Sequence, residues 1–469
     1  MNSSSLMYKL SRQYLFFAFF FAVLFWLPDT AFGYIGPGAG FAFLYSFFVI
    51  FLVILIAPLF LLVWPIWYVI HRLRTGGGPQ NPRVKRVVVL GLDGMDPILT
   101  KKYIDQGKLP NFKKLADEGT FLPLRTTTPS VSPVAWSTFQ TGVNPCKHNI
   151  FDFLNRDLKT CAPVLSSSVI GGPKGYRKIG KLRLPKGKPV VRLLRKSQPF
   201  WKFLGDKGVF STVLRVPITF PPEKFNGLSI SGMCVPDLKG TQGTFTCFST
   251  AAPDKTHTGG KRVPVSWNSD SIDTHIPGPV NAAADNPEEM TIPLTICRNQ
   301  NNGGVNLKLN GKTIKLKQGE YSDWLKLDFS AGPGMKATGV ARFFLTQRDP
   351  DLVLYMTPIN IDPEKPSLPV SHPVYYSAYL AKLQGPYATL GLAEDTWALN
   401  EGVIDDRAFY RQAWNIHEER EKMYFHALKM NRNGVVVCVF DTSDRVQHMF
   451  WRYLEPEHPA NKATPPTLD

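Results

Sequence analysis

The sequence lacks the patterns that mark disulfide-bonded, zinc-finger and nucleic-acid-binding proteins. Its 469 residues include only six cysteines, which are scattered and form no CxxC pair. This spacing predicts neither a disulfide framework nor a zinc finger. The net charge of +17 comes without a helix-turn-helix or RNA-binding signature, so we expect no nucleic acid among its partners.

Acidic residues are missing from the segment Lys174–Lys196, which carries ten basic residues. A segment with this composition is often a solvated surface loop. It can also attract anions, such as lipid headgroups or a phosphate-bearing substrate, because its electrostatic field extends over a Debye length. Both interpretations remain open from the sequence.

Charged residues of either sign are absent between Phe41 and Ile70. These 30 residues are long enough to cross about 30 Å of hydrocarbon at about 1.5 Å per residue. They predict a transmembrane segment within residues 34–74. A shorter apolar stretch, residues 14–27, follows Lys9 and Arg12 and predicts a signal peptide or a first membrane helix within residues 1–33.

Basic residues follow the predicted span directly, at Arg72, Arg74 and Arg83. By the positive-inside tendency such residues stay in the cytoplasm. We therefore expect a protein anchored in the inner or plasma membrane, in contact with membrane lipid, with its bulk in the cytoplasm; an extracytoplasmic orientation is the alternative. Residues 75–85 include a glycine-rich stretch and predict a linker.

Strand and helix patterns alternate after the linker. The apolar run "RVVVLGL", which starts at Arg86, predicts a buried strand, and two helices are predicted over Pro97–Gln106 and Pro110–Glu118. Similar patterns continue to residue 252. This alternation predicts an α/β fold with a mostly parallel sheet and helices on both faces.

The pattern changes between residues 253 and 347. The stretch "VNLKLNGKTIKL" has alternating apolar residues on both sides of Asn310-Gly311, which predicts a β-hairpin. Further strand patterns without helices predict an inserted antiparallel β module. Residues 348–469 predict the second part of the α/β core, with a long helix over Asp405–Met430 and a buried strand "VVVCVF".

Two strand ends carry side chains suited to metal binding. Asp93 stands at the carboxyl end of the first strand, where ligands gather in open α/β sheets, although an isolated aspartate there is more often a turn residue. Asp444 and His448 follow the last strand at positions i and i+4, on one face of a helix. This pair suits Zn²⁺ or a similar divalent ion, with a surface ion pair as the alternative.

A helix start is predicted within "SVSPVAWSTFQTG". Ser132 fits the N-cap, Pro133 the first helical position and Gly142 the helix stop. The amides of Val134 and Ala135 would then be free to bind an anionic phosphoryl group at the positive end of the helix. The alternative is an ordinary helix cap.

Taken together, three stretches resemble the alkaline phosphatase superfamily, and most closely its type I phosphodiesterase/nucleotide pyrophosphatase branch. They are "VVVLGLDGMDP", "TTPSVSPVAWSTFQTGVNPCKHNIFDF" and "FDTSDRVQHMFW", in this order. The resemblance implies two divalent metal ions, usually zinc. It implies that Asp93 binds one metal, that Asp444 and His448 bind the other, and that Ser132 is the nucleophile and also contacts the first metal.

The chain also departs from the family pattern. Ala135 stands where phosphodiesterases of this group often carry an asparagine. The family's "DHG" string and its final histidine do not follow His448, and His458, within "EPEHPAN", is predicted to lie in a loop outside the site. Each metal would have about two protein ligands where zinc needs three or four. We therefore expect a C-terminally truncated chain whose sheet lacks its last strands.

These observations predict a membrane-anchored, metal-dependent phosphoester hydrolase of the phosphodiesterase type. Phosphomonoester hydrolysis or phosphoglycerol transfer would use the same site design. Sulfatase activity is disfavoured because the Cys/Ser-x-Pro-x-Arg pattern is missing around Ser132. The alternative from another class is a non-catalytic, membrane-bound scaffold, in which the α/β part and the β module bind a partner.

Overall fold

The structure is a computed structural model that consists of two units, residues 1–75 and 76–469. It describes residues 48–56, 58, 63, 82–172, 175–179, 182–186, 190–252, 259–284, 287–300, 303–332 and 334–463. The predicted signal peptide or first membrane helix and most of the predicted transmembrane segment lie outside these residues, and the linker is described only from residue 82. Residues 48–56 are helical. Among the described helices, none combines the length and the apolar character that a membrane crossing requires.

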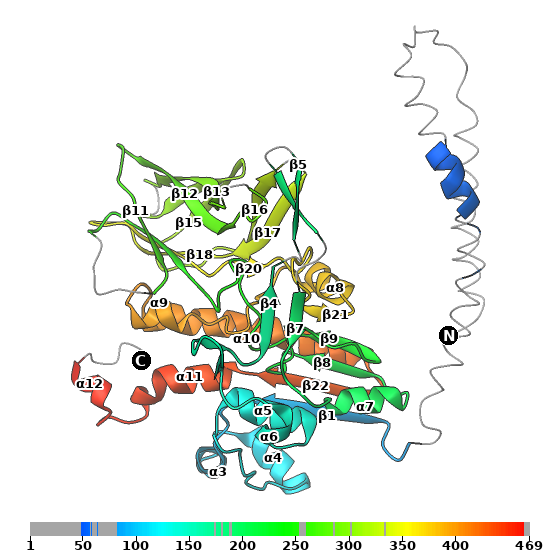
Figure 1. The fold of residues 1–469 in the computed structure, drawn as a ribbon. Helices are drawn as coiled ribbons and strands as arrows, with labels where there is room; N and C mark the ends of the chain where they lie inside the picture. Colours follow the sequence, from blue (N-terminus) through cyan, green and yellow to red (C-terminus); the bar gives the residue numbers. More distant parts are fainter. Residues whose placement is uncertain are drawn as a thin grey trace, which may run out of the picture. The chain divides into compact units, whose positions relative to one another are not determined.

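A five-stranded sheet in the second unit has the order β1–β22–β8–β9–β21 (Figure 1). The strands are β1 (Arg86–Leu92), β22 (Gly434–Phe440), β8 (Ser211–Leu214), β9 (Gly227–Ile230) and β21 (Ser371–His372). The first four strands are parallel and β21 is antiparallel to β9. The predicted, mostly parallel sheet is therefore confirmed.

Helices cover both faces of this sheet. On one face, residues 436, 438 and 440 of β22 pack with side chains of α8 and α10, and on the other face residues 435, 437 and 439 pack with α5 and α7. The period of two and the burial on both faces are typical of a parallel strand. The helices of the unit are α3 (Pro97–Asp105), α4 (Pro110–Glu118), α5 (Ser132–Thr141), α6 (Pro145–His148), α7 (Phe200–Asp206), α8 (Tyr375–Gln384), α9 (Thr396–Asn400), α10 (Asp406–Met430), α11 (Thr442–Phe450), the 3-10 turn η1 (Trp451–Tyr453) and α12 (Pro459–Ala463).

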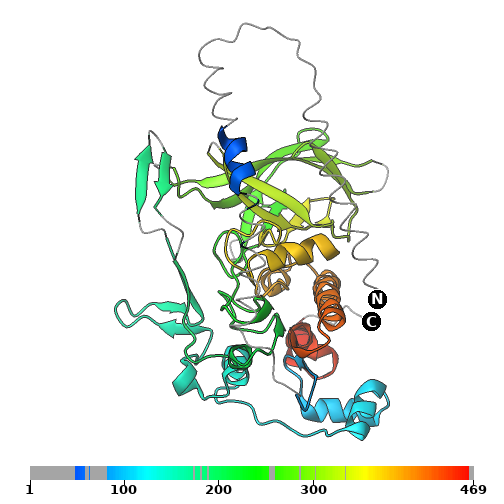
Figure 2. The same cartoon turned by 90° about the vertical axis from the view of Figure 1, so that its right-hand side faces the viewer.

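The long helix α10 forms as its sequence pattern predicts. Asp405 is the N-cap, and its side chain accepts a hydrogen bond from the Ala408 amide at 2.7 Å. The predicted apolar stripe is buried, including Phe409 and Met423. α10 lies beside α11 in both views (Figure 1 and Figure 2). The described residues beyond β22 form only helical elements and no further strand.

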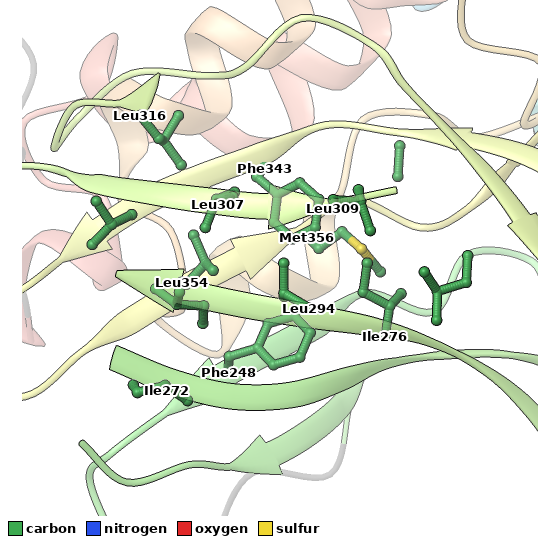
Figure 3. Packing of buried hydrophobic residues seen from close by; sticks show 14 of the residues in the cluster. Phe248, Ile272, Ile276, Leu294, Leu307, Leu309, Leu316, Phe343, Leu354 and Met356 are labelled. Carbon is green, nitrogen blue, oxygen red and sulfur yellow. The ribbon is translucent and has the colours of Figure 1, made fainter. Parts of the chain in front are cut away.

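A β module is inserted between β9 and β21. Its strands are β10 (Thr246–Ser249), β11 (Lys261–Pro264), β12 (Ser271–Val280), β13 (Glu289–Arg298), β14 (Val305–Leu309), β15 (Lys312–Leu316), β16 (Leu325–Gly332), β17 (Met335–Ala341), β18 (Phe343–Gln347), β19 (Val353–Met356) and β20 (Asn360–Ile361). The hairpin predicted at Asn310-Gly311 joins β14 to β15. Buried apolar side chains, such as Phe248, Leu307 and Phe343, form one core inside the module (Figure 3).

The predicted limits of the module, residues 253–347, are too narrow. β10 precedes this range, and β19 and β20 follow it, yet β19 pairs antiparallel with β10 and β18, and β20 pairs with β17. The run "DLVLYMTP", which contains β19, lies within residues 348–469, the range predicted to be the second part of the α/β core. A short, fully apolar run fits a buried strand in either kind of sheet, so its composition does not reveal its neighbours.

The basic segment Lys174–Lys196 contains the strands β5 (Tyr176–Ile179), β6 (Leu182–Pro185) and β7 (Val190–Leu193). β5 and β6 pair antiparallel, and β7 pairs with β4 (Ser168–Gly171). A further short pair, β2 (Leu154–Arg156) with β3 (Pro163–Leu165), precedes them. The described part of this segment is thus organised into strands.

Candidate active site

Asp93 directly follows β1 and is held by the end of the neighbouring strand. Its amide donates a hydrogen bond to the Phe440 carbonyl at 2.9 Å, which extends the pairing of β1 and β22 by one residue. Its carbonyl accepts a hydrogen bond from the Ser443 hydroxyl at 2.7 Å. Its side chain is buried. These contacts fix the carboxylate at the carboxyl end of the parallel strands, as the sequence predicts.

The two carboxylate oxygens of Asp93 have different surroundings. Oδ1 accepts hydrogen bonds from Trp136 Nε1 at 2.8 Å and from the Ser132 hydroxyl at 3.3 Å. Oδ2 is buried without a hydrogen-bond partner. Burial raises the pKa of Asp93, and the nearby carboxylates of Asp444 and Asp441 raise it further, against the two donors. A partnerless buried carboxylate oxygen is unusual in proteins and suits a proton or a cation.

Ser132 begins α5, but it is not the N-cap. Val131 is the N-cap, with an extended backbone at φ −110° and ψ 138°, and no side chain caps the helix. The predicted cap is therefore wrong by one residue, because the Val131 carbonyl accepts the first helical hydrogen bond. The Ser132 hydroxyl points to Asp93 instead. The predicted helix stop is confirmed, since Gly142 is left-handed at φ 65°.

The amides of Val134 and Ala135 are not free. Both donate to the Val131 carbonyl, at 2.9 Å and 3.0 Å. Their predicted role as phosphate-binding donors is wrong for this conformation, because the shift of the cap to Val131 gives them an acceptor inside the helix. A hydrogen-bond donor to a substrate phosphate has to come from elsewhere in the site.

Asp444 and His448 lie together on α11. His448 Nε2 is 3.3 Å from Asp444 Oδ1, and the Asp444 side chain is 12% exposed while that of His448 is 68% exposed. Arg445 approaches the other oxygen of Asp444 at 3.4 Å. A Cβ atom placed on Gly94 would lie 2.9 Å from Asp444 Oδ1. Asp444 therefore packs against the residue that follows Asp93, and the four predicted side chains converge on one region.

A buried ion pair, which the sequence analysis missed, lies behind this region. Arg420 of α10 pairs with Asp441 at the end of β22. Burial favours the neutral form of Asp441, but Arg420 and Arg215 outweigh burial, so the pKa of Asp441 is lowered. Glu394 is buried nearby, and burial together with Asp441 raises its pKa. The only sequence signal for this pair was the position of Asp441 at a strand end.

A hollow of about 360 Å³ lies beside Asp444. Its lining is formed by Gly94, Asp444, Gln447, His448, Trp451 and His458. His458 was expected to lie in a loop outside the site. It does lie in a loop, but the fold brings that loop to the hollow.

The fit of these residues to metal ions is partial. Asp93 Oδ2 offers one partnerless oxygen, and Asp444 with His448 offers a carboxylate and an imidazole. Among the residues that the structure describes, no group of three or more His, Cys, Asp or Glu side chains is arranged to hold a metal. A zinc site needs four protein ligands, or three protein ligands and a water. The two donor sets are therefore incomplete within this part of the chain.

Residues 87–255 match the family model described as type I phosphodiesterase / nucleotide pyrophosphatase. The matched range begins in β1 and contains Asp93 and Ser132, whereas Asp444 and His448 lie beyond it. No curated protein and no solved structure matches the chain. The match confirms the resemblance drawn from the sequence motifs, and it supports a phosphoric ester hydrolase.

Proposed function

We propose that this chain, whose residues 87–255 match the type I phosphodiesterase / nucleotide pyrophosphatase family model, hydrolyses phosphodiesters with Ser132 as its nucleophile. The observation that carries the proposal is the 3.3 Å hydrogen bond between the Ser132 hydroxyl and the buried carboxylate of Asp93. A serine at a helix start, oriented by a carboxylate at the end of a parallel strand, can accept a phosphoryl group.

The chemistry is an in-line displacement at phosphorus. The Ser132 oxygen forms a bond to phosphorus while the bond from phosphorus to the leaving alcohol breaks. The proton of Ser132 passes to Asp93 Oδ1, which already accepts this hydrogen bond and whose pKa is raised by burial, and it returns to the serine oxygen when the intermediate is hydrolysed. The departing alkoxide takes up a proton from water. Water then hydrolyses the phosphoseryl intermediate, releases the phosphate monoester and restores the hydroxyl.

The proposal includes two divalent metal ions, with Zn²⁺ the first to test. Asp93 would bind one ion through Oδ2, with Ser132 beside it, and Asp444 with His448 would bind the other. When bound, such ions stabilise the charge that develops on phosphate oxygens. The remaining ligands of both ions would not come from the described residues.

A non-catalytic scaffold is the competing function, because the described residues lack a three-donor metal group. Phosphomonoester hydrolysis and phosphoglycerol transfer remain candidates for the same serine. The full chain should be purified with Zn²⁺ and assayed with a nitrophenyl phosphodiester and with the matching monoester. We expect turnover of the diester, and a loss of at least about 10⁴-fold in Ser132→Ala.

The matched control for this experiment is Ser130→Ala, which changes an exposed serine two residues earlier. We expect it to keep wild-type turnover. If the wild-type chain is inactive with every divalent metal, the scaffold function replaces the hydrolase. Faster turnover of the monoester than of the diester would reassign the substrate class.

The proposal places the hydrolase at a membrane, anchored by residues 34–74, with its second unit in the cytoplasm. The support is the charge-free run from Phe41 to Ile70 followed by basic residues. A reporter fused after Arg86 tests the orientation, because a reporter that is active only outside the cytoplasm would reverse it. The basic segment Lys174–Lys196 would then face anionic lipid headgroups or the phosphate of the substrate.

A further inference from the structure

The loop after α11 carries His458 and is anchored to the body of the protein. The 3-10 turn η1 follows α11 directly, and its Tyr453 hydroxyl donates to Asp406 Oδ2 of α10 at 2.5 Å. The chain then turns back, and the His458 amide donates to the Glu455 carbonyl at 2.9 Å. The loop therefore starts from a fixed point and closes on itself.

Asn461 stabilises this loop through hydrogen bonds of its side chain and its backbone. Its side-chain amide donates to the carbonyls of Arg452 and Glu455, at 2.9 Å and 3.1 Å, and its side-chain oxygen accepts from Arg452 Nε at 3.0 Å. The Asn461 backbone amide donates to the His458 carbonyl at 2.9 Å. These hydrogen bonds fix the backbone on both sides of His458, so the position of its ring beside the hollow is set before any ligand binds.

The hydrogen bonding of the His458 ring determines which nitrogen is a donor. The Ala460 amide donates to His458 Nδ1 at 3.2 Å. Nδ1 therefore acts as an acceptor, and the neutral ring carries its proton on Nε2. Nε2 is thus a hydrogen-bond donor and has no lone pair available for a metal.

The surroundings of His458 also point to an anion rather than a metal as its ligand. His458 lines the hollow together with Asp444 and His448. Even so, these three described side chains do not form a metal-holding group. The charge of Asp444 is offset by its contact with Arg445, so an anion can approach.

The amides of Val134 and Ala135 donate to the Val131 carbonyl, so in this conformation they do not donate to a phosphate. We propose that His458, through Nε2–H, donates a hydrogen bond to a phosphate oxygen of the ester bound in this hollow. This inference rests on the proposed function, since it assumes a phosphoester substrate. It assigns a substrate-binding residue beyond the part of the chain that matches the family model.

Kinetic measurements on the full chain test the assignment first. His458→Ala should lower kcat/KM for the nitrophenyl phosphodiester about 10-fold, mainly through a higher KM, because one hydrogen bond to a charged oxygen is lost. His458→Gln should recover part of this loss, since its side-chain amide can donate in place of Nε2–H. The matched control is His275→Ala, on an exposed position of β12 in the β module, and it should match the wild type.

Binding of inorganic phosphate tests the inference without turnover. The histidine ring signals of the metal-free full chain are followed by NMR during a phosphate titration, and the His458 signal is identified by its loss in His458→Ala. We expect this signal to shift and the phosphate Kd to rise about 10-fold in His458→Ala. This result would support the inference even if the wild-type chain showed no turnover and the proposed function failed.

Two results would overturn the inference while the proposed function stands. The first is an active wild-type chain with unchanged KM and unchanged phosphate Kd in His458→Ala. The second is a His458→Ala variant that binds Zn²⁺ more weakly but binds phosphate like the wild type. This second result would make His458 a metal ligand and would require its ring to change tautomer.

Discussion

The β module and the central sheet differ in how completely the rest of the protein buries their apolar side chains. In the module, apolar side chains from three sheets enclose one core, and Phe329 and Leu307 are fully buried. In the sheet, β22 is covered on both faces, but β1 at its edge leaves Val88 40% exposed and Leu90 50% exposed. Parallel strands are usually covered on both faces. The residue that begins the candidate site, Asp93, follows the less covered strand.

This contrast indicates that the β module contributes mainly to stability, whereas the central sheet carries the candidate site. The module is held by a closed core and contributes none of the candidate site residues. The sheet brings Asp93, Ser132 and Asp444 together at a partly uncovered edge. Substitutions in the two regions should therefore have different effects, and the following four experiments test the contrast in order of decreasing effect.

The largest effect is expected from breaking the core of the module. Phe329 is fully buried on β16, where its ring packs against Gly278. Phe329→Ala removes this ring and should lower the free energy of unfolding by about 3–5 kcal/mol, as measured by urea denaturation. Val280→Ala, at an exposed position of the same module, is the control and should change it by less than about 0.5 kcal/mol. Equal effects would show that the module has no closed core.

The free energy of unfolding should depend on pH because of a buried carboxylate at the junction between the two regions. Asp395 caps α9 and accepts a hydrogen bond from Tyr355 of β19 at 2.7 Å. Burial raises the pKa of Asp395 from 3.8 to about 6. The native state therefore binds this proton more tightly than the unfolded state, and the free energy of unfolding falls as pH rises from about 4 to 6 and is constant above that range.

Asp395→Asn isolates this contribution, because it removes the titrating group and keeps an acceptor for the cap. The wild type should lose on the order of 2–3 kcal/mol between pH 4 and 6 relative to the variant. Urea denaturation of both proteins across this range measures the difference. Parallel pH profiles for the two proteins would show that the Asp395 pKa is the same in the native and unfolded states.

The site itself can be tested by a matched pair of glycines. Gly94 and Gly107 both have left-handed backbones, at φ +69° and +71°, but a Cβ at Gly94 would lie 2.9 Å from Asp444 Oδ1, whereas nothing lies within 4 Å at Gly107. Each alanine should cost about 1 kcal/mol through its backbone conformation. Gly94→Ala should in addition displace Asp444 and lower phosphodiester turnover about 10-fold or more. Equal turnover in both variants would exclude Asp444 from the site.

The smallest effect is expected at Val88, and its partner in the register of the sheet serves as the comparison. Val88 of β1 pairs with Val436 of β22, but Val436 is fully buried. Val436→Ala should cost about 2 kcal/mol in unfolding free energy and Val88→Ala less than about 1 kcal/mol. A cost at Val88 equal to that at Val436 in thermal or urea unfolding would mean that β1 is covered in solution.

The larger features of the fold follow from sequence periodicity. The parallel sheet, the helix α10 and the hairpin at Asn310-Gly311 were all predicted, because each depends on a local pattern of apolar residues or a specific turn. The assignment of β19 to the β module was not predicted, because the sequence of a short apolar strand does not determine which strands it pairs with. Only the pairing with β10 and β18 assigns it to the module.

The details of the site were less accessible from the sequence. The predicted cap was Ser132, but the cap lies at Val131, whose carbonyl accepts the first helical hydrogen bond, and the residue types in "SVSP" do not show which carbonyl does so. The position of His458 depends on hydrogen bonds from Asn461, which no hydrophobic period signals. The pair of Arg420 with Asp441 joins a helix to a strand end far along the chain. Such contacts are products of tertiary structure.

The pairing of the first strand of the sheet with the last has a consequence for biosynthesis. Ser443 and Asp93 are hydrogen-bonded although 350 residues separate them in the chain. A ribosome that adds roughly 5–20 residues per second needs on the order of 20–70 s to make that interval. The intervening β-rich segment can fold during this time, while Asp93 and Ser132 wait for β22 and α11. The candidate site is therefore assembled only after β22 and α11 have been made, and until then a nascent chain holds Asp93 and Ser132 without Asp444 and His448.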